Sequence, residues 1–239
     1  MDESLEARVA AVAALDEPTR RQLYEHVVRQ PEAVSRDEAA AALQLPRSTA
    51  AFHLDRLAQE GLLDVVYARR TGRSGPGAGR PAKLYRRSQR HVSVSLPDRR
   101  YDLAGRLLAA ALHDAEQSED SPRAVLERRS YQLGVELGET ARAADPHNRQ
   151  IAVLGVLQAY GFEPRPEGPA VVLGNCPFHA LAQDYPETVC RMNRHLLQGL
   201  LHGLGETGWW VRPCSPAGGC CVDLQPSSGN QPPGPQGAG

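Results

Sequence analysis

Apolar residues in the N-terminal part of the chain recur at helical spacing in four short segments. The spacing predicts helices over residues 5–14, from 16–19 onward, from 35 to near 42, and over 47–60. Ser35 followed by Glu38 has the pattern of a capping box, which marks the start of the third helix. Pro46 and Gly61 lie where the fourth helix begins and ends. Two helices joined by a turn of about three or four residues form a helix-turn-helix unit.

A hairpin is predicted directly after this unit. Residues 62–67 have the composition of a strand, and residues 82–85 are its expected partner. The segment between them, residues 71–81, is rich in Gly and Arg and resembles a wing that can lie along a narrow minor groove of DNA. A nucleotide-binding phosphate loop is the competing interpretation, but neither a Walker pattern nor a GxGxxG sequence opening a helix is present.

The same region also carries an excess of positive charge. The whole chain has a formal net charge of −1, yet residues 47–90 contain ten basic residues and only three acids. Such a local excess is typical of a surface that contacts the phosphates of double-stranded DNA. The expected DNA contacts lie on the fourth helix and the wing: Arg47, Ser48, Thr49, His53, Arg56, Arg73, Arg80 and Lys83. Of these, Ser48 also fits a simple helix-capping role.

The C-terminal part predicts a mixed domain that is mainly helical. Helices are expected over residues 98–117, 122–143, 148–160 and 186–204, and strands over 171–173, 209–211 and 221–224. The first of these helices could pack on its own core or on a second subunit. We favour a homodimer, because two recognition helices must be held about 34 Å apart to read a palindromic operator. Gly134, Gly138 and Ala141 give the second helix a face that permits close packing.

These patterns predict an α+β, mainly α chain with four parts. They are a winged helix-turn-helix domain (1–90), a linker and dimerisation helix (91–118), a cysteine-containing sensor domain (119–225) and a disordered tail (226–239). The acidic start, Met1-Asp2-Glu3, and the absence of an apolar run of about 18 residues predict a cytoplasmic protein that does not enter a membrane.

The sensor domain contains five cysteines, all after residue 175, and they are its candidate reactive residues: Cys176, Cys190, Cys214, Cys220 and Cys221. In a reducing cytoplasm, clustered cysteines are more often metal or redox ligands than disulfides. The spacing is not that of a CxxC…CxxC zinc site, and buried free cysteines are the alternative. Adjacent cysteines on a strand face opposite ways, so one of Cys220 and Cys221 is expected to be a core residue.

Four segments carry a resemblance to a known family: Asn175–His179, Val189–Asn193, Gly219–Val222 and the wing stretch Gly79–Tyr85. With them the chain resembles actinobacterial and cyanobacterial winged-helix regulators related to the repressor of the Suf iron–sulfur assembly operon, within a broader ArsR- or DeoR-like group. The resemblance spans residues 5–224. It implies an iron–sulfur cluster on Cys176, Cys190 and Cys220, and a cluster-loaded form that represses genes for cluster assembly.

Three departures from the family leave the fourth ligand and the type of cluster open. Cys221 is a second cysteine directly after Cys220, the third cluster cysteine. Cys214 and His179 are both candidates for the fourth ligand. Three thiolates with His179 would also suit zinc, so a zinc-stabilised regulator without redox sensing is one alternative. A small-molecule-binding or enzymatic C-terminal domain is another. Neither a nucleophile–base pair nor paired carboxylates occur at a convincing spacing, so we expect no enzymatic activity.

Overall fold

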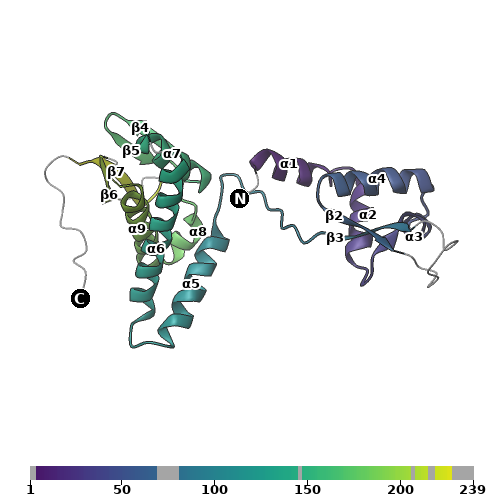
Figure 1. The fold of residues 1–239 in the computed structure, drawn as a ribbon, viewed down its shortest axis with the longest axis horizontal. Helices are drawn as coiled ribbons and strands as arrows, with labels where there is room; N and C mark the ends of the chain where they lie inside the picture. The colour runs from purple at the N-terminus through teal and green to yellow at the C-terminus, as the bar shows by residue number, and fades with distance from the viewer. Residues whose placement is uncertain (1–3, 69–80, 145–146, 206–207, 215–218, 228–239) are drawn as a thin grey trace. The chain divides into compact units, whose positions relative to one another are not determined.

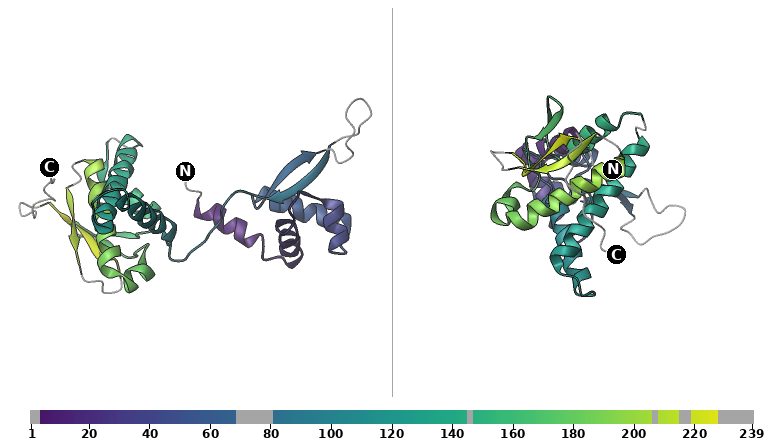
Figure 2. Two further views of the ribbon diagram at one scale, coloured as in Figure 1. Left: turned by 90° about the horizontal axis from the view of Figure 1, so that it is seen from below. Right: turned by 90° about the vertical axis from the view of Figure 1, so that its left-hand side faces the viewer.

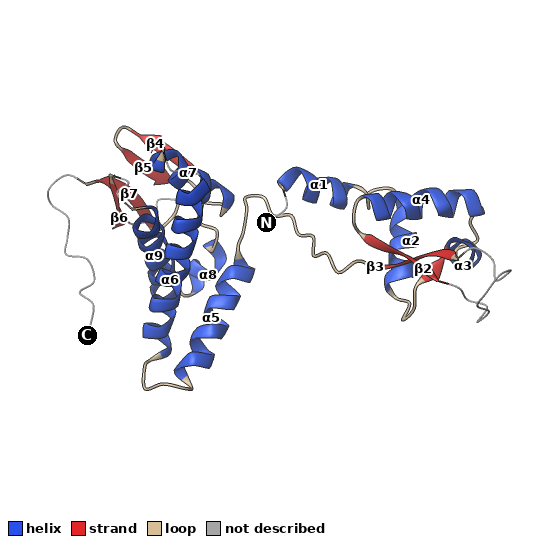
Figure 3. Cartoon of the chain, in the orientation of Figure 1, coloured by secondary structure: helices blue, strands red, loops and turns tan. Residues whose placement is uncertain are grey.

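The computed structural model describes residues 4–68, 81–144, 147–205, 208–214 and 219–227 (Figure 1). The chain divides into two compact units, Met1–Val94 and Ser95–Gly239, and each has its own hydrophobic core. The chain is α+β, as predicted (Figure 3). In the segments that the structure describes, no helix is both long and apolar enough to cross a bilayer.

The first unit consists of short helices and an antiparallel sheet. Its helices are α1 (Leu5–Ala13), α2 (Pro18–Val28), α3 (Arg36–Ala42) and α4 (Arg47–Gln59). Its strands are β1 (Val34–Ser35), β2 (Leu63–Ala68) and β3 (Ala82–Arg87), which the described residues arrange in the order β1-β3-β2. The four predicted helices and the hairpin are confirmed. The centre of the predicted wing loop, with Arg73 and Arg80, lies outside the described residues.

The core of the first unit fixes the orientation of α4. Ala50, Leu54 and Leu57, predicted to point inward, are each fully buried. They pack with Leu23 and Val27 of α2, and the side chain of Tyr85 in β3 closes the cluster. Because one stripe of α4 is fixed inside this core, the opposite stripe is held outward.

The second unit combines long helices with a separate antiparallel sheet (Figures 1 and 2). Its helices are α5 (Tyr101–Ala115), α6 (Pro122–Ala144), α7 (Arg149–Ala159), α8 (His179–Asp184) and α9 (Pro186–Leu204). Its strands are β4 (Pro164–Glu167), β5 (Ala170–Leu173), β6 (Trp209–Pro213) and β7 (Val222–Pro226), in the order β4-β5-β7-β6 among the described residues. Two elements were not predicted: α8, which is short, and β4, an edge strand in which two prolines interrupt the pattern.

Glycines bring α6 and α9 into direct backbone contact. A Cβ atom placed at Gly134 or Gly138 of α6 would overlap with backbone atoms of α9. Conversely, a Cβ atom at Gly199 or Gly203 of α9 would overlap with the backbone of α6. The small-residue face predicted for residues 122–143 is therefore a close helix–helix interface, and it fixes the long helix α9 within the unit.

The apolar stripe of α5 packs against the core of its own chain. Ala104, Leu107 and Ala111 are buried in the core of the second unit, where α5 packs against α6. The stripe is thus not left free for a second subunit, in contrast to the packing that we favoured from the sequence. The reason is that α6 covers it immediately after the intervening turn. Leu112, the next residue after the buried Ala111, is 57% exposed.

We expect Gly199→Ala to lower the free energy of unfolding of the second unit by about 1–3 kcal/mol, the usual cost of overpacking. The added methyl group would overlap with the carbonyl oxygen of Tyr131. Gly105→Ala in α5 is the matched control, because its methyl group would meet no described atom within 4 Å outside its own turn of helix. Removing a helical glycine there should stabilise the protein by about 0.5–1 kcal/mol.

Urea unfolding followed by tryptophan fluorescence measures both effects, because Trp209 and Trp210 lie in β6 of this unit. Equal stabilities for the two variants would contradict the proposed backbone contact between α6 and α9.

Candidate nucleic-acid interface and cysteine site

Local hydrogen bonds define both the start of α3 and the turn between α3 and α4. The Ser35 hydroxyl accepts from the Glu38 amide at 3.2 Å, and the Ser35 amide donates to the Glu38 carboxylate at 2.8 Å, so the predicted capping box is present. Gln44 adopts a left-handed conformation with φ of 53°, and the Leu45 amide donates to the Ala40 carbonyl at 2.9 Å. This turn places the N-terminus of α4 at the surface.

The exposed stripe of α4 carries Arg47, Ser48 and Arg56, while Thr49 is half-buried. Arg47 forms an ion pair with Asp37 of α3, and Arg56 Nη2 lies 2.6 Å from Glu60 Oε1. Both pairs are at the surface, where ion pairs contribute little to stability. The two guanidinium groups can therefore exchange a carboxylate for a phosphate at small cost.

His53 does not point outward as we expected. Its side chain is only 13% exposed, and its Nδ1 lies 3.5 Å from Glu17 Oε2 at the start of α2. The physical reason is helical spacing: His53 is three residues after Ala50 and four before Leu57, which are both core residues. The position therefore belongs to the inner flank of α4, and His53 joins α4 to α2.

The side chain of Lys83, on strand β3 of the wing, contacts α4. Its ammonium group forms an ion pair with Asp55, and the Tyr85 hydroxyl donates to Asp55 Oδ1 at 2.6 Å. Partial burial acts to raise the pKa of Asp55, but the hydrogen bonds from Lys83 and Tyr85 outweigh it and lower that pKa. Asp55 thus holds the strand β3 against α4.

Phe52 is a surface residue that we did not predict as functional. It lies on α4 between Ser48 and Arg56, and 65% of it is exposed. The signal in the sequence is a large aromatic residue on the polar side of an otherwise regular amphipathic helix.

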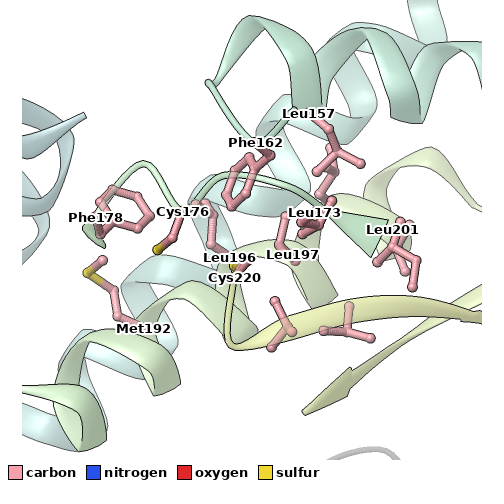
Figure 4. Packing of buried hydrophobic residues seen from close by; sticks show 14 of the residues in the cluster. Leu157, Phe162, Leu173, Cys176, Phe178, Met192, Leu196, Leu197, Leu201 and Cys220 are labelled. Carbon is pink, nitrogen blue, oxygen red and sulfur yellow. The ribbon is translucent and has the colours of Figure 1, made fainter. Parts of the chain in front are cut away.

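The cysteines are brought together by the connections around β5, α9 and β7. Cys176 follows β5, Cys190 lies in the first two turns of α9, and Cys220 and Cys221 directly precede β7. The Cys220 amide donates to the carbonyl of Leu173 at 3.1 Å, which holds this segment beside the end of β5. Figure 4 shows Cys176 and Cys220 among the buried apolar side chains of the second unit.

Asn175 anchors the loop that carries Cys176. Its side-chain amide is buried and donates to the carbonyls of Asp98 at 3.0 Å and Gly161 at 2.6 Å. Arg99 donates to the Asn175 side chain and also, at 3.1 Å, to the carbonyl of Cys176. The loop is thereby fixed from both sides.

The thiols of Cys176, Cys190, Cys220 and Cys221 shift one another's pKa: Cys220 interacts with Cys176 and with Cys221, and Cys190 interacts with Cys221. Asn193 of α9 donates to Cys220 Sγ at 3.1 Å. Hydrogen bonds to Cys176 and Cys221, together with burial, raise the pKa of Cys220. Burial and its bond to Cys221 raise the pKa of Cys190 to about 12.

Cys221 has the opposite character. The hydrogen bond from Cys220 lowers its pKa to about 6, with further help from Cys190 and Asn193 and against the effect of burial. Hydrogen bonding to Cys220 likewise lowers the pKa of Cys176. Cys176 and Cys221 are thus the two thiols of the group whose pKa is lowered.

A cavity of about 860 Å³ opens beside these thiols. Its lining includes every sequence-predicted ligand except Cys220, and in addition Cys221: Cys176, His179, Cys190, Cys214 and Cys221. One of the two adjacent cysteines is a core residue, as expected, but it is Cys220, the ligand that the resemblance implies, while Cys221 lines the cavity. Strand alternation does not apply, because β7 begins only at Val222 and both cysteines precede it.

The thiols nevertheless interact pairwise and do not surround a common point. Among the residues that the structure describes, no three His, Cys, Asp or Glu side chains are arranged to hold one metal ion. Arg194, which sequence reasoning missed, also lines the cavity, and its buried Nε has no hydrogen-bond partner in the described segments.

Residues 15–66 match a family model described as a helix-turn-helix domain. The match covers α2, α3 and α4 and ends within β2, so it includes the whole of the surface formed by α4. No curated protein is a significant match to the chain. The helix-turn-helix domain indicates a DNA-binding transcription regulator.

The ion pair and the hydrogen bond of Asp55 predict that the stability of the first unit depends on pH. Because the folded-state pKa of Asp55 is lowered, its stabilising contribution is present above the unfolded pKa of about 3.9 and is lost as the pH falls through the folded value. We therefore expect Asp55→Asn to be less stable than the wild type near neutral pH and to lose less stability on acidification.

Thermal unfolding followed by circular dichroism over a series of acidic pH values tests this expectation. Parallel curves for wild type and variant would show that Asp55 contributes nothing to the acid sensitivity.

Proposed function

We propose that the chain is a homodimeric transcriptional repressor whose affinity for operator DNA is controlled by an iron–sulfur cluster in the second unit. The observation that carries the cluster is the cavity that Cys176, Cys190 and Cys221 line together with His179 and Cys214. The first unit supplies the DNA contact through α4 and the wing. The second unit then has a sensing role and no catalytic one.

The chemistry of the donors fits such a cluster. Iron–sulfur clusters are held by cysteine thiolates, and the three thiols come from three parts of the fold: the loop after β5, the first turns of α9 and the segment before β7. Arg194 adds a positive charge to the cavity wall. Bound there, a cluster would supply an oxidation-sensitive tie between these parts.

Two arguments assign the third thiol of this site to different cysteines. The family resemblance assigns Cys220, whereas position in the cavity favours Cys221. Cys220 is 4% exposed and receives a hydrogen bond from Asn193, so its sulfur belongs to the wall behind the cavity. For the fourth position, His179 and Cys214 both line the cavity.

A homodimer follows from the geometry of operator recognition. One α4 helix covers a single half-site, and a palindrome presents its half-sites about 34 Å apart, so two copies are required. Ala104, Leu107 and Ala111 of α5 are buried within their own unit, so we expect the contact between subunits to use residues that stay exposed in one chain.

Single cysteine variants, reconstituted anaerobically, test the cluster. We expect Cys176→Ser, Cys190→Ser and Cys221→Ser to lose visible absorption and bound iron, because each removes a thiol from the cavity. Cys220→Ser should retain both, and it serves as the matched control beside Cys221. Loss in Cys220→Ser with retention in Cys221→Ser would establish the assignment that the resemblance implies. A colourless wild type that binds zinc and no iron would replace the redox sensor by a structural zinc site.

Arg47→Ala tests the DNA surface. If Arg47 contacts a base edge, the variant should lose about 1–3 kcal/mol of binding free energy on the operator and much less on random duplex. Asp37→Asn is the matched control, because it removes the partner of Arg47 and leaves the guanidinium in place. Binding is measured by fluorescence anisotropy at one fixed salt concentration. Equal losses on both DNAs would make Arg47 a phosphate contact.

A further inference from the structure

An aromatic ring stands exposed on the surface that we assign to DNA. Single exposed apolar residues are common on proteins, so the exposure of Phe52 alone proves nothing. Its position is more informative, because Phe52 is four residues after Ser48 and four before Arg56, and all three are exposed. The ring therefore lies in the middle of the outward stripe of α4, where side chains of a recognition helix meet base edges.

The ring of Phe52 is held in place from behind. It packs edge-on against the ring of His53, with centroids 5.2 Å apart and an interplanar angle of 72°. His53 in turn lies beside the Glu17 carboxylate, which accepts hydrogen bonds from the Thr19 and Arg20 amides at 3.1 and 2.6 Å and so caps α2. The aromatic ring is thus supported by the body of the helix-turn-helix unit, which reduces the entropy that binding must remove.

The charges around Phe52 select the kind of partner. Residues 47–54 contain no acid, and the exposed guanidinium groups of Arg47 and Arg56 flank the ring along the helix. A protein partner with an apolar surface, or a second copy of this chain, would have to remove the ion pairs of both guanidinium groups from water and would offer them no anion in return. The major groove of DNA places phosphates on both sides of an edge that carries apolar thymine methyl groups.

We infer that Phe52 is a specificity-determining residue that contacts the 5-methyl group of a thymine in the major groove. The inference rests on the proposed DNA-binding function and adds a base preference to it. The contact discriminates thymine from cytosine, whose C5 carries no methyl group. Arg47 and Ser48 lie one turn before Phe52 and would contact the neighbouring base pairs or phosphates.

The test begins with a duplex library that has a randomised central segment. The full-length wild type and Phe52→Ala each select sequences from it under identical conditions. The best wild-type sequence is then synthesised with thymine replaced by deoxyuridine at one position at a time, which removes only the methyl group. Val12→Ala is the control variant, because Val12 is an apolar residue of the same unit, 49% exposed, and lies on α1.

We expect deoxyuridine at one position of each half-site to weaken wild-type binding by about fourfold, the factor that corresponds to one methyl-sized group. Phe52→Ala should bind the thymine and deoxyuridine duplexes equally and should select sequences without the thymine preference. Val12→Ala should behave as the wild type. Unchanged thermal unfolding of Phe52→Ala will show that the exposed ring is not needed for folding.

Two results overturn the inference, and they differ in what else they affect. If Phe52→Ala keeps the wild-type preference and the same sensitivity to deoxyuridine, Phe52 reads no methyl group, while DNA binding itself stands. If the wild type enriches no sequence at all, the proposed operator binding fails as well.

Discussion

The direct contact between the backbones of α6 and α9 determines where the chemistry of the second unit lies. Four glycines, two on each helix, leave no room for a side chain at these four positions. Because α9 is fixed in this way along its C-terminal half, its first turns project toward the connections around β5 and β7. Cys190 and Asn193 lie on those turns and meet Cys176 and Cys220 there. The cysteine site thus depends on residues that have no polar group of their own.

The two adjacent cysteines have different surroundings although they share a short segment. Cys220 is bonded to the carbonyl of Leu173 through its amide and to Asn193 through its sulfur, so it is part of the wall. Cys221 faces the cavity and approaches Cys190. The sequence presents both cysteines as candidates, and only the local geometry of the folded chain separates them.

Much of the first unit was predictable because its signals are local. A capping box, a proline and a glycine mark the ends of α3 and α4, and helical spacing marks the buried residues. The orientation of His53 could have been obtained from the same spacing, since it lies between two core residues. The surroundings of Cys221 could not, because they depend on where β7 begins and on a hydrogen bond to β5, which are properties of the folded sheet. Strand β4 was missed because its prolines hide the strand pattern.

The described cations of the first unit that we assign to DNA are each paired with a carboxylate in the free protein: Arg47 with Asp37, Arg56 with Glu60 and Lys83 with Asp55. Binding to a phosphate is then an exchange of anionic partners. Each carboxylate left behind attracts a cation from solution, which offsets part of the counterion release from the DNA. The affinity of this domain should therefore depend less steeply on ionic strength than its number of basic residues suggests. Regulation of DNA binding by salt would be correspondingly weak.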